Sequence, residues 1–350
     1  MRNRLFLSLT AALSLAMMLF AVLAPAPAKL PYEGRAPSRF SMDDPDAYFF
    51  DHLPHRTALL TLCRDIEFAL GKNEYGGAFC GKNGYIFSNE NTDEAVLARN
   101  LAAFAAFAET ADIPLYTALV PSKTDALPGL LPPLYTAARD ALWERAKTAP
   151  AYLDLLPSLR TAGGAGKYIY YRGDHHLTSL GAYYVYRQFA APLGFSAADA
   201  ADFAVSVVCA DFAGSDARRL LTAADDRIAL FRARGDSALT VTTDGAVRRG
   251  LYDFDACGGD DPYGVFPGYG AGYTTIRHAD AHPRILMLCD SYGCALAPFL
   301  ARHFDVDLVD LRYAAPDVRG LLREENYTAV LCYYGMDTLA AHEILYKLQG

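Results

Sequence analysis

From Arg284 onward, the chain shows short continuous apolar runs separated by segments whose apolar residues recur every three or four positions. Runs of the first kind are typical of buried strands, and segments of the second kind are typical of helices. The pattern predicts strands at 285–289, 306–311 and 329–333, and helices at 294–303, 317–325 and 336–347. Such regular alternation predicts an α/β fold with a doubly wound, mostly parallel sheet.

The same alternation begins earlier in the chain and is then interrupted. The pattern predicts helices at 93–110, 134–149 and 179–189 and strands at 113–120 and 168–171. Thr178 is placed to cap the helix that follows it. Residues 200–280 instead carry short β-prone pieces between glycine and aspartate clusters, which predicts a β-rich insertion.

The N-terminal segment has a different character. Arg2 and Arg4 precede a run without charged side chains from Leu5 to Ala24, and small residues alternate with proline over 24–28. This pattern is typical of an export signal cleaved after Ala26 or Ala28. The run is also long enough to remain as a membrane anchor. We therefore expect residues 1–28 to be a signal peptide or anchor, and 29–350 to be one domain outside the cytoplasm.

Composition narrows the functions that remain. The formal net charge of −8 argues against nucleic acid as a partner. Seven cysteines include no C-x-x-C pair and no zinc spacing, which argues against a cysteine-bound metal knuckle. No cofactor is expected. Cys209 and Cys257 could form a disulfide in an exported protein, whereas Cys289 and Cys332 lie in apolar runs and are expected in the core.

One candidate nucleophile follows an apolar strand. In an open α/β sheet, ligands bind at the carboxyl ends of the strands, where helix N-termini point inward. Ser291 lies in such a position, between the strand 285–289 and the helix that begins near 294. A serine there can attack a carbonyl carbon while free amides stabilise the developing charge. The simpler alternative is that Ser291 only caps the helix.

A candidate base lies in the loop Arg172-Gly-Asp-His-His-Leu-Thr178. If the loop is extended, Asp174 and His176 face the same way and His175 faces the other. His176 is then the expected base, with Asp174 fixing its tautomer. His175 is expected to be a buried structural residue. A divalent metal held by the same three side chains is an alternative that adjacent ligands fit poorly. The histidines at 278, 282, 303 and 342 are interpreted as solvated side chains near turns.

Taken together, the two loops resemble the DHHW family, a branch of the SGNH hydrolase superfamily close to the alginate O-acetylation proteins. The resemblance rests on Tyr171-Arg-Gly-Asp-His-His-Leu-Thr178 and Ile285-Leu-Met-Leu-Cys-Asp-Ser-Tyr292, and extends over about residues 75 to 350. It implies a circularly permuted SGNH hydrolase-like fold in which Asp174, His176 and Ser291 form a catalytic triad. His175, Arg172, Tyr292 and Tyr263 are candidate supporting residues.

This chain departs from the family pattern at two places. Leu177 replaces the family's tryptophan, and Gly268-Tyr-Gly270 stands where the pattern ends in Gly-Asn. If that asparagine donates to the oxyanion, the backbone amides of Ser291 and Tyr292 must take over its role here, together with an unidentified side chain.

The resemblance implies a carbohydrate O-acetyltransferase or acetylesterase of the cell envelope. Its substrate would be a polysaccharide, and a membrane-bound acyltransferase would be a partner that supplies acetyl groups. The alternative from another class is a catalytically silent carbohydrate-binding or scaffold protein of an envelope assembly. A metal-dependent hydrolase is a third option, and it would be sensitive to chelators and indifferent to loss of Ser291.

Overall fold

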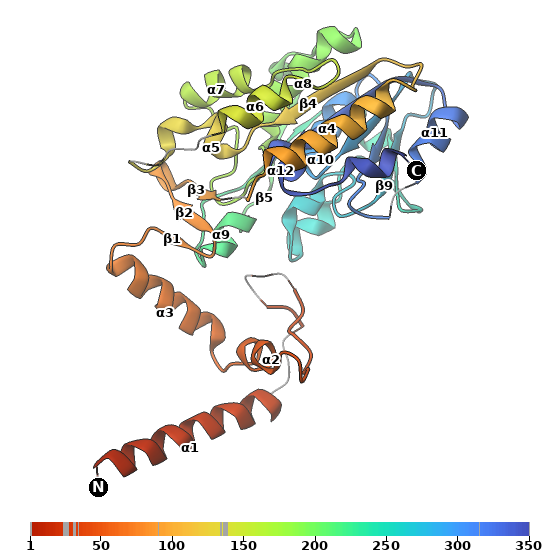
Figure 1. Cartoon of the computed structure of the whole chain (residues 1–350). Helices are drawn as coiled ribbons and strands as arrows, with labels where there is room; N and C mark the ends of the chain where they lie inside the picture. Colours follow the sequence, from red (N-terminus) through yellow and green to blue (C-terminus); the bar gives the residue numbers. More distant parts are fainter. Residues whose placement is uncertain are drawn as a thin grey trace. The chain divides into compact units, whose positions relative to one another are not determined.

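The computed structural model describes residues 2–23, 28–30, 33, 35–89, 91–133, 135, 139–314 and 316–349. It divides into two compact units. The smaller comprises Met1–Phe79 with Ala217–Ala223, and the larger comprises Cys80–Asp216 with Ala224–Gly350. The helices and strands carry the labels of Figure 1.

The helices of the larger unit are α4 (Glu94–Ala108), α5 (Lys123–Ala126), α6 (Asp140–Ala146), α7 (Leu156–Gly164), α8 (Ser179–Leu193), α9 (Ser215–Arg219, which crosses the unit boundary), α10 (Tyr292–Leu300), α11 (Val318–Glu324) and α12 (Met336–Ala341). Its strands are β3 (Ile86–Ser88), β4 (Leu115–Val120), β5 (Ala204–Cys209), β6 (Ile228–Arg232), β7 (Thr240–Thr243), β8 (Ala246–Arg249), β9 (Tyr273–Arg277), β10 (Arg284–Cys289), β11 (Asp305–Val309) and β12 (Tyr327–Gly335). Short 3₁₀ turns include η5 (Phe254–Gly258), η6 (Pro262–Val265) and η7 (Leu345–Gln349).

The main sheet has seven strands in the order β4-β12-β10-β11-β9-β7-β8. The first four are parallel, with β10 between β12 and β11, and the last three are joined by antiparallel pairing. The fold is therefore α/β as predicted, but the sheet is mixed rather than mostly parallel. The difference arises because β7, β8 and β9, from the predicted β-rich insertion, extend the main sheet. A parallel pair needs a long crossover connection, whereas β7 and β8 are joined by a two-residue turn that allows only antiparallel pairing, and β9 lies antiparallel to both β7 and β11.

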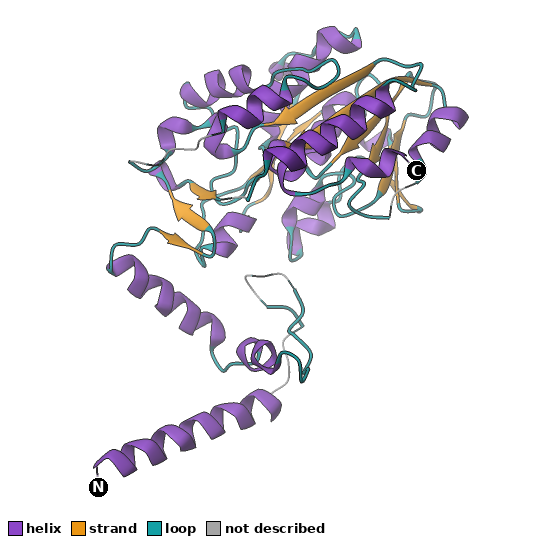
Figure 2. Cartoon of the chain, in the orientation of Figure 1, coloured by secondary structure: helices purple, strands orange, loops and turns teal. Residues whose placement is uncertain are grey.

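The hydrophobic core covers the parallel half of the sheet. Leu286 and Leu288 of β10 pack with side chains of α4, α6, α12 and η7, while Ile285 and Met287 on the alternate positions are fully buried as well. A strand buried on both faces has a continuous apolar sequence, as β10 does. Figure 2 shows the helices packed against the strands of this unit. The strands and helices predicted from 285 to 333 are confirmed in kind, with ends shifted by a few residues. The helix predicted at 336–347 ends at Ala341, and the separate 3₁₀ turn η7 follows it.

Two local predictions have different outcomes. The strand predicted at 168–171 is wrong, because only an isolated bridge joins Tyr170 to Leu177. The segment folds back on itself, so its backbone bonds go to the returning chain rather than to a sheet. The Cys209–Cys257 disulfide is confirmed, and Cys289 and Cys332 are buried. The predicted helix 134–149 is observed as α6, with residues 134 and 136–138 outside the described residues.

The smaller unit contains α1 (Arg2–Leu23), α2 (Pro45–Asp51), α3 (Arg56–Ala69) and β1 (Glu74–Tyr75), and β2 (Ala78–Cys80) begins in it. Asp44 caps α2 by accepting from the amide of Ala47. Among the residues that the structure describes, no helix meets the length and apolarity needed to span a membrane. The Ala-Pro segment predicted as a cleavage region includes residues 24–27, which lie outside the described residues.

Candidate active site

The turn that carries Ser291 is fixed by strand, helix and one carboxylate. β10 ends at Cys289 and α10 begins at Tyr292, so Ser291 lies at the carboxyl edge of the parallel strands. The buried carboxylate of Asp290 accepts from the amide of Tyr292 at 3.0 Å and from the amide of Gly335, at the end of β12, at 2.9 Å. Asp290 thus ties the serine turn to the neighbouring strand.

The loop that carries Asp174 and His176 has no regular secondary structure of its own. Tyr171 donates its amide to the carbonyl of His176, and Thr178 donates to Ile169, which closes the loop on itself. The buried carboxylate of Asp226 accepts from the amides of Arg172 and Gly173 at 2.8 and 2.6 Å. After the loop, the Thr178 hydroxyl accepts from the amide of Gly181 and caps α8, as predicted.

The structure brings Ser291, His176 and Asp174 together although 115 residues separate the serine from the histidine. His176 Nδ1 lies 2.6 Å from Asp174 Oδ1, and His176 Nε2 lies 2.7 Å from Ser291 Oγ. An ionised carboxylate can only accept, so Nδ1 carries the proton and Nε2 is left to accept from the serine hydroxyl. This geometry suits removal of the serine proton by the imidazole.

Asp174 is held as a charged group inside the protein. Its side chain is 4 % exposed, and it accepts from the His176 ring, the His176 amide and the amide of Ser215. Burial alone would raise its pKa. The neighbouring imidazoles and these hydrogen bonds outweigh that effect and keep the pKa of Asp174 well below its ordinary value. The carboxylate therefore stays ionised and orients His176 at neutral pH.

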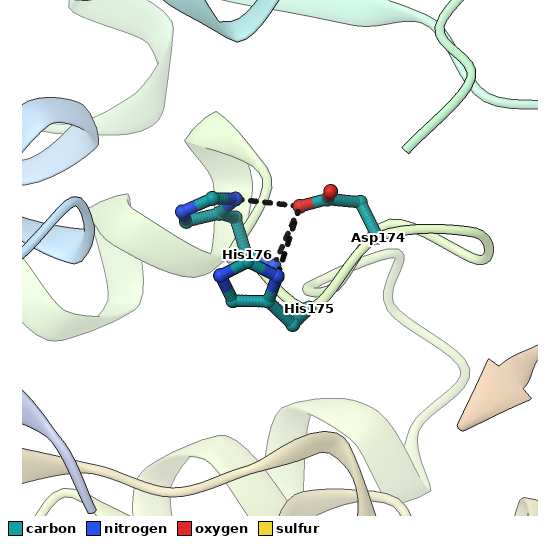
Figure 3. A group of neighbouring side chains, drawn as sticks. All are labelled: Asp174, His175 and His176. Atoms are coloured by element: carbon teal, nitrogen blue, oxygen red, sulfur yellow. Dashed lines mark hydrogen bonds and ion pairs between the residues drawn. The ribbon is translucent and has the colours of Figure 1, made fainter. Parts of the chain in front are cut away.

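His175 does not lie where the extended-loop argument predicted. Its ring lies 3.9 Å from the ring of His176 rather than on the opposite side, and Figure 3 shows both imidazoles facing one oxygen of Asp174. The physical reason is that the loop turns at this point, because the His176 amide bonds back to Asp174. His175 is also half-exposed rather than buried, and its Nδ1 pairs with the Ser215 hydroxyl at 2.8 Å. The predicted Asp174–His176 pair is present, but strand geometry was the wrong reason for it.

The other sequence-predicted residues surround His176 in different ways. The ring of Tyr263 stacks on His176 at 3.9 Å and 15°, and its buried hydroxyl has no hydrogen-bond partner among the described residues. Tyr292 donates its hydroxyl to the carbonyl of His175 at 2.9 Å. Arg172 does not join them, because its guanidinium lies over the rings of Tyr85 and Tyr168 and bonds to the carbonyl of Asp225.

Sequence reasoning missed a buried ion pair behind the loop. Lys123 and Asp216 approach to 2.6 Å with side chains 3 % and 1 % exposed. The Lys123 ammonium also donates to the carbonyls of Ile86 and Arg172. Asp216 follows Ser215, whose amide and hydroxyl hold Asp174 and His175. Nothing in the sequence pointed to Asp216 or Asp226 as supports of the site.

Of the two backbone amides expected to stabilise the oxyanion, those of Ser291 and Tyr292, one is already hydrogen-bonded within the protein. The Tyr292 amide was expected to face the oxyanion, yet it donates to Asp290. That leaves the Ser291 amide as the backbone candidate of the two. Tyr269, at the place of the family's Gly-Asn, has its ring centroid 6.4 Å from that of His176 and donates its hydroxyl to Asp261 at 2.6 Å.

A cavity of about 340 Å³ opens beside Tyr269. Its walls include Thr243 at the end of β7, Phe266, and the ion pair between Arg248 and Asp253 at 2.8 Å. Aromatic, hydroxyl and paired charged groups together suit a neutral polar ligand better than a charged one.

A metal could in principle contact Asp174, His175 and His176, whose ligand atoms lie within 4.8 Å of one another. Both ring nitrogens of His176 are already engaged, however, one with Asp174 and the other with Ser291. An ion would have to replace one of these bonds. The arrangement therefore fits a proton relay better than a metal centre.

Comparison with known proteins confirms the family resemblance. Residues 154–309 match the family model described as DHHW protein. No curated protein sequence matches the chain. A crystal structure of a DHHW family protein from Eubacterium siraeum is similar with a TM-score of 0.66 and 19 % identity, over 79 % of this chain and 96 % of that one.

Two further solved structures are similar. Bacillus cereus PatB1 with a sulfonyl adduct has a TM-score of 0.64 and 22 % identity, over 77 % of this chain and 98 % of that one. The O-acetyltransferase domain of Pseudomonas putida AlgJ has a TM-score of 0.48 and 18 % identity, over 76 % of this chain and 93 % of that one. At these identities the likenesses show the fold alone.

Proposed function

We propose that this protein, whose residues 154–309 match the DHHW family, is a Ser-His-Asp carbohydrate O-acetyltransferase or acetylesterase. The observation that carries the proposal is the continuous relay from Asp174 through His176 to Ser291, with contacts of 2.6 and 2.7 Å. A serine that only capped α10 would bond to an amide of the first helical turn. No such side-chain cap bond is found for Ser291 among the described residues.

In the first step, the Ser291 hydroxyl attacks the carbonyl carbon of an acetyl ester while its proton passes to His176 Nε2. The tetrahedral intermediate collapses, the ester C–O bond breaks, and the leaving alcohol takes the proton from His176. The product is acetyl-Ser291. Asp174 remains ionised throughout and stabilises the imidazolium that forms between these two proton transfers.

In the second step, an acceptor hydroxyl gives its proton to His176 and attacks the acetyl-serine, and Ser291 regains its proton. A sugar hydroxyl as acceptor makes the protein a transferase, and water makes it an esterase. The cavity beside Tyr269 is the proposed acceptor site, because the Tyr269 ring lies edge-on to His176 with its centroid 6.4 Å away and the cavity has a mixed lining that suits a sugar.

The proposal extends to the topology of the fold, the location of the protein and the source of the acetyl groups. The chain order Asp174, His176, Ser291 agrees with a circularly permuted SGNH hydrolase-like topology, with the parallel strands as its doubly wound part. Export by the apolar segment 5–24 would put the domain outside the cytoplasm, on an envelope or extracellular polysaccharide. Acetyl groups are made in the cytoplasm, so a transferase there needs a membrane-bound acyltransferase as its donor partner.

The test is hydrolysis of 4-nitrophenyl acetate by the purified protein. Ser291→Ala and His176→Ala should each lower kcat/KM by about 10³-fold or more, because members of a triad act as a unit. Ser206→Ala, at an exposed serine of β5, is the matched control and should change nothing. A sulfonyl fluoride should label wild type and Ser206→Ala but not Ser291→Ala. Equal rates in wild type and Ser291→Ala would remove the enzyme proposal.

A further inference from the structure

The two hydrogen bonds of the His176 ring leave one of its movements unrestrained. Nδ1 bonds to Asp174 and Nε2 bonds to Ser291. The N–H and the lone pair of a neutral imidazole lie in the plane of the ring, so the ring can still rock about the line that joins its two nitrogens. Because proton transfer needs Nε2 aimed at the serine hydroxyl, a group packed on the face of the ring would keep the relay aligned.

Two rings cover the faces of this imidazole. The His175 ring lies 3.9 Å from it at 36°, and the Tyr263 ring lies 3.9 Å from it at 15°. No ring contact joins His175 to Tyr263 among the described residues, so the two rings lie on opposite sides of His176. His175 is half-exposed, whereas Tyr263 is 1 % exposed. Tyr263 therefore supports the buried face of the imidazole.

Tyr263 is itself held from several directions. It lies in η6, where Asp261 accepts from its backbone amide at 3.3 Å. The ring centroids of Phe266, Tyr269 and Phe212 lie 4.9, 5.4 and 6.4 Å from its own. A side chain packed in this way keeps one orientation. The Tyr263 ring therefore presents a fixed flat surface to His176.

The contact between Tyr263 and His176 belongs to the ring and not to the hydroxyl. The hydroxyl is buried and has no hydrogen-bond partner among the described residues. The face of an aromatic ring carries partial negative charge, which attracts the imidazolium that forms when Ser291 gives up its proton. The stacked ring can thus orient His176 before the proton transfer and stabilise it afterwards.

We propose that Tyr263 is a positioning residue of the relay, which keeps the His176 ring aimed at Ser291 by packing on its buried face. The inference rests on the function proposed above, because it concerns the same proton transfer. It also gives residues 200–280 a part in the reaction, since η6 lies in this stretch and outside the strands of the main sheet.

The experiment compares three variants of the full-length protein in the hydrolysis of 4-nitrophenyl acetate. Tyr263→Leu removes the flat ring and should lower kcat at least about tenfold, with little change in KM. Tyr263→Phe keeps the ring and should restore the wild-type kcat. Phe104→Leu is the matched control, because Phe104 is equally buried but packs in the hydrophobic core on α4. It should lose stability without losing activity in the folded protein.

Two further measurements separate position from stability. A sulfonyl fluoride reacts with Ser291 through the same proton transfer, so its labelling rate should fall in Tyr263→Leu together with kcat. Denaturant unfolding gives the folded fraction of each variant, to which both rates are normalised. Tyr263→Met, which also lacks a flat ring but has an adaptable side chain, should be as slow as Tyr263→Leu.

Two results would overturn the inference. The first is a Tyr263→Leu or Tyr263→Met protein that, once folded, is as active as Phe104→Leu. The second is a Tyr263→Phe protein that loses as much kcat as Tyr263→Leu, because the hydroxyl rather than the ring would then be responsible. Ser291→Ala is measured alongside. Wild-type rates in Ser291→Ala would remove the proposed function and this inference with it, whereas Ser291-dependent hydrolysis that persists in Tyr263→Leu removes the inference alone.

Discussion

The two loops that meet in the candidate active site are held in different ways. The Ser291 turn lies between a buried strand and a helix, and the amide of Gly335 in β12 donates to its Asp290. The loop with Asp174 and His176 is enclosed by the isolated bridge between Tyr170 and Leu177, ahead of α8, and has no strand of its own. One loop is shaped by its neighbours in the chain, and the other by residues far from it.

The distant supports of the histidine loop are polar and buried. Asp226 accepts from two amides of the loop, 53 and 54 residues away in the chain. The Ser215 amide donates to Asp174, 41 residues away. Lys123, which precedes the loop in the chain, donates to the carbonyl of Arg172. Buried polar networks of this kind are costly when one partner is removed. We therefore expect the histidine loop to be the more fragile half of the site.

The largest effect is expected for Lys123→Met, which leaves the buried carboxylate of Asp216 without its cation. Breaking a buried pair by removing one partner typically costs about 3–5 kcal/mol of stability. Denaturant unfolding should show a loss of this size, together with lower esterase activity in the fraction that remains folded.

Two control variants test whether the loss of stability in Lys123→Met comes from the buried ion pair. The double variant Lys123→Met/Asp216→Asn should recover part of the lost stability, because no unpaired charge remains buried. Lys147→Met removes an exposed partner of Glu144 and should leave the unfolding midpoint nearly unchanged. If Lys123→Met unfolds at the wild-type midpoint, the buried pair does not support the loop.

A matched pair of carboxylates tests the comparison directly. Asp226 accepts from two backbone amides of the histidine loop and also from the Tyr168 hydroxyl, whereas Asp290 accepts from the amide of Tyr292 in the serine turn and from that of Gly335 in β12. Replacing either by alanine should cost about 1–3 kcal/mol for each amide left unpaired. Asp226→Ala should also lower kcat/KM more than Asp290→Ala, because β10 and α10 still shape the serine turn.

Both carboxylate variants are measured by denaturant unfolding and by ester hydrolysis. Asp226→Asn and Asp290→Asn keep one acceptor oxygen and should lie between the alanine variants and wild type. A larger loss of activity in Asp290→Ala than in Asp226→Ala would reverse the assignment of the fragile loop.

The serine turn was predictable from the sequence, whereas the histidine loop was not. The strand-turn-helix around Ser291 was predictable because burial and helical spacing are local signals, and β10 and α10 appear within a few residues of their predicted ends. The strand expected at 168–171 is absent because the segment turns back on itself, with the Tyr171 amide donating to His176. Tertiary contacts of Asp226 with Tyr168 and of Lys123 with Tyr171 override local β propensity.

Residues 200–280 show most clearly what the sequence could not predict. Residues 200–280 were expected to be an insertion, yet they supply Ser215, Asp216 and Tyr263 to the site and three strands to the main sheet. No spacing rule links an aspartate at 226 to a loop at 172, because that contact depends on how the whole chain closes. The candidate relay residues were predictable, whereas their supports were not.

The smallest effects are expected at the two tyrosines beside His176, and they separate ring contact from hydrogen bonding. Tyr292→Phe removes a bond to the carbonyl of His175 and should cost about 1 kcal/mol, with a modest loss of activity. Tyr263→Phe keeps the ring stacked on His176 and deletes a buried hydroxyl that has no partner among the described residues. Such a deletion should be neutral or slightly stabilising, because an unpaired polar group no longer has to be desolvated. Thermal unfolding and ester hydrolysis, measured for both variants, show which substitution lowers stability and activity more.

A greater loss of activity in Tyr263→Phe than in Tyr292→Phe would mean that the Tyr263 hydroxyl takes part in the reaction. The site would then depend on more than the relay of Asp174, His176 and Ser291.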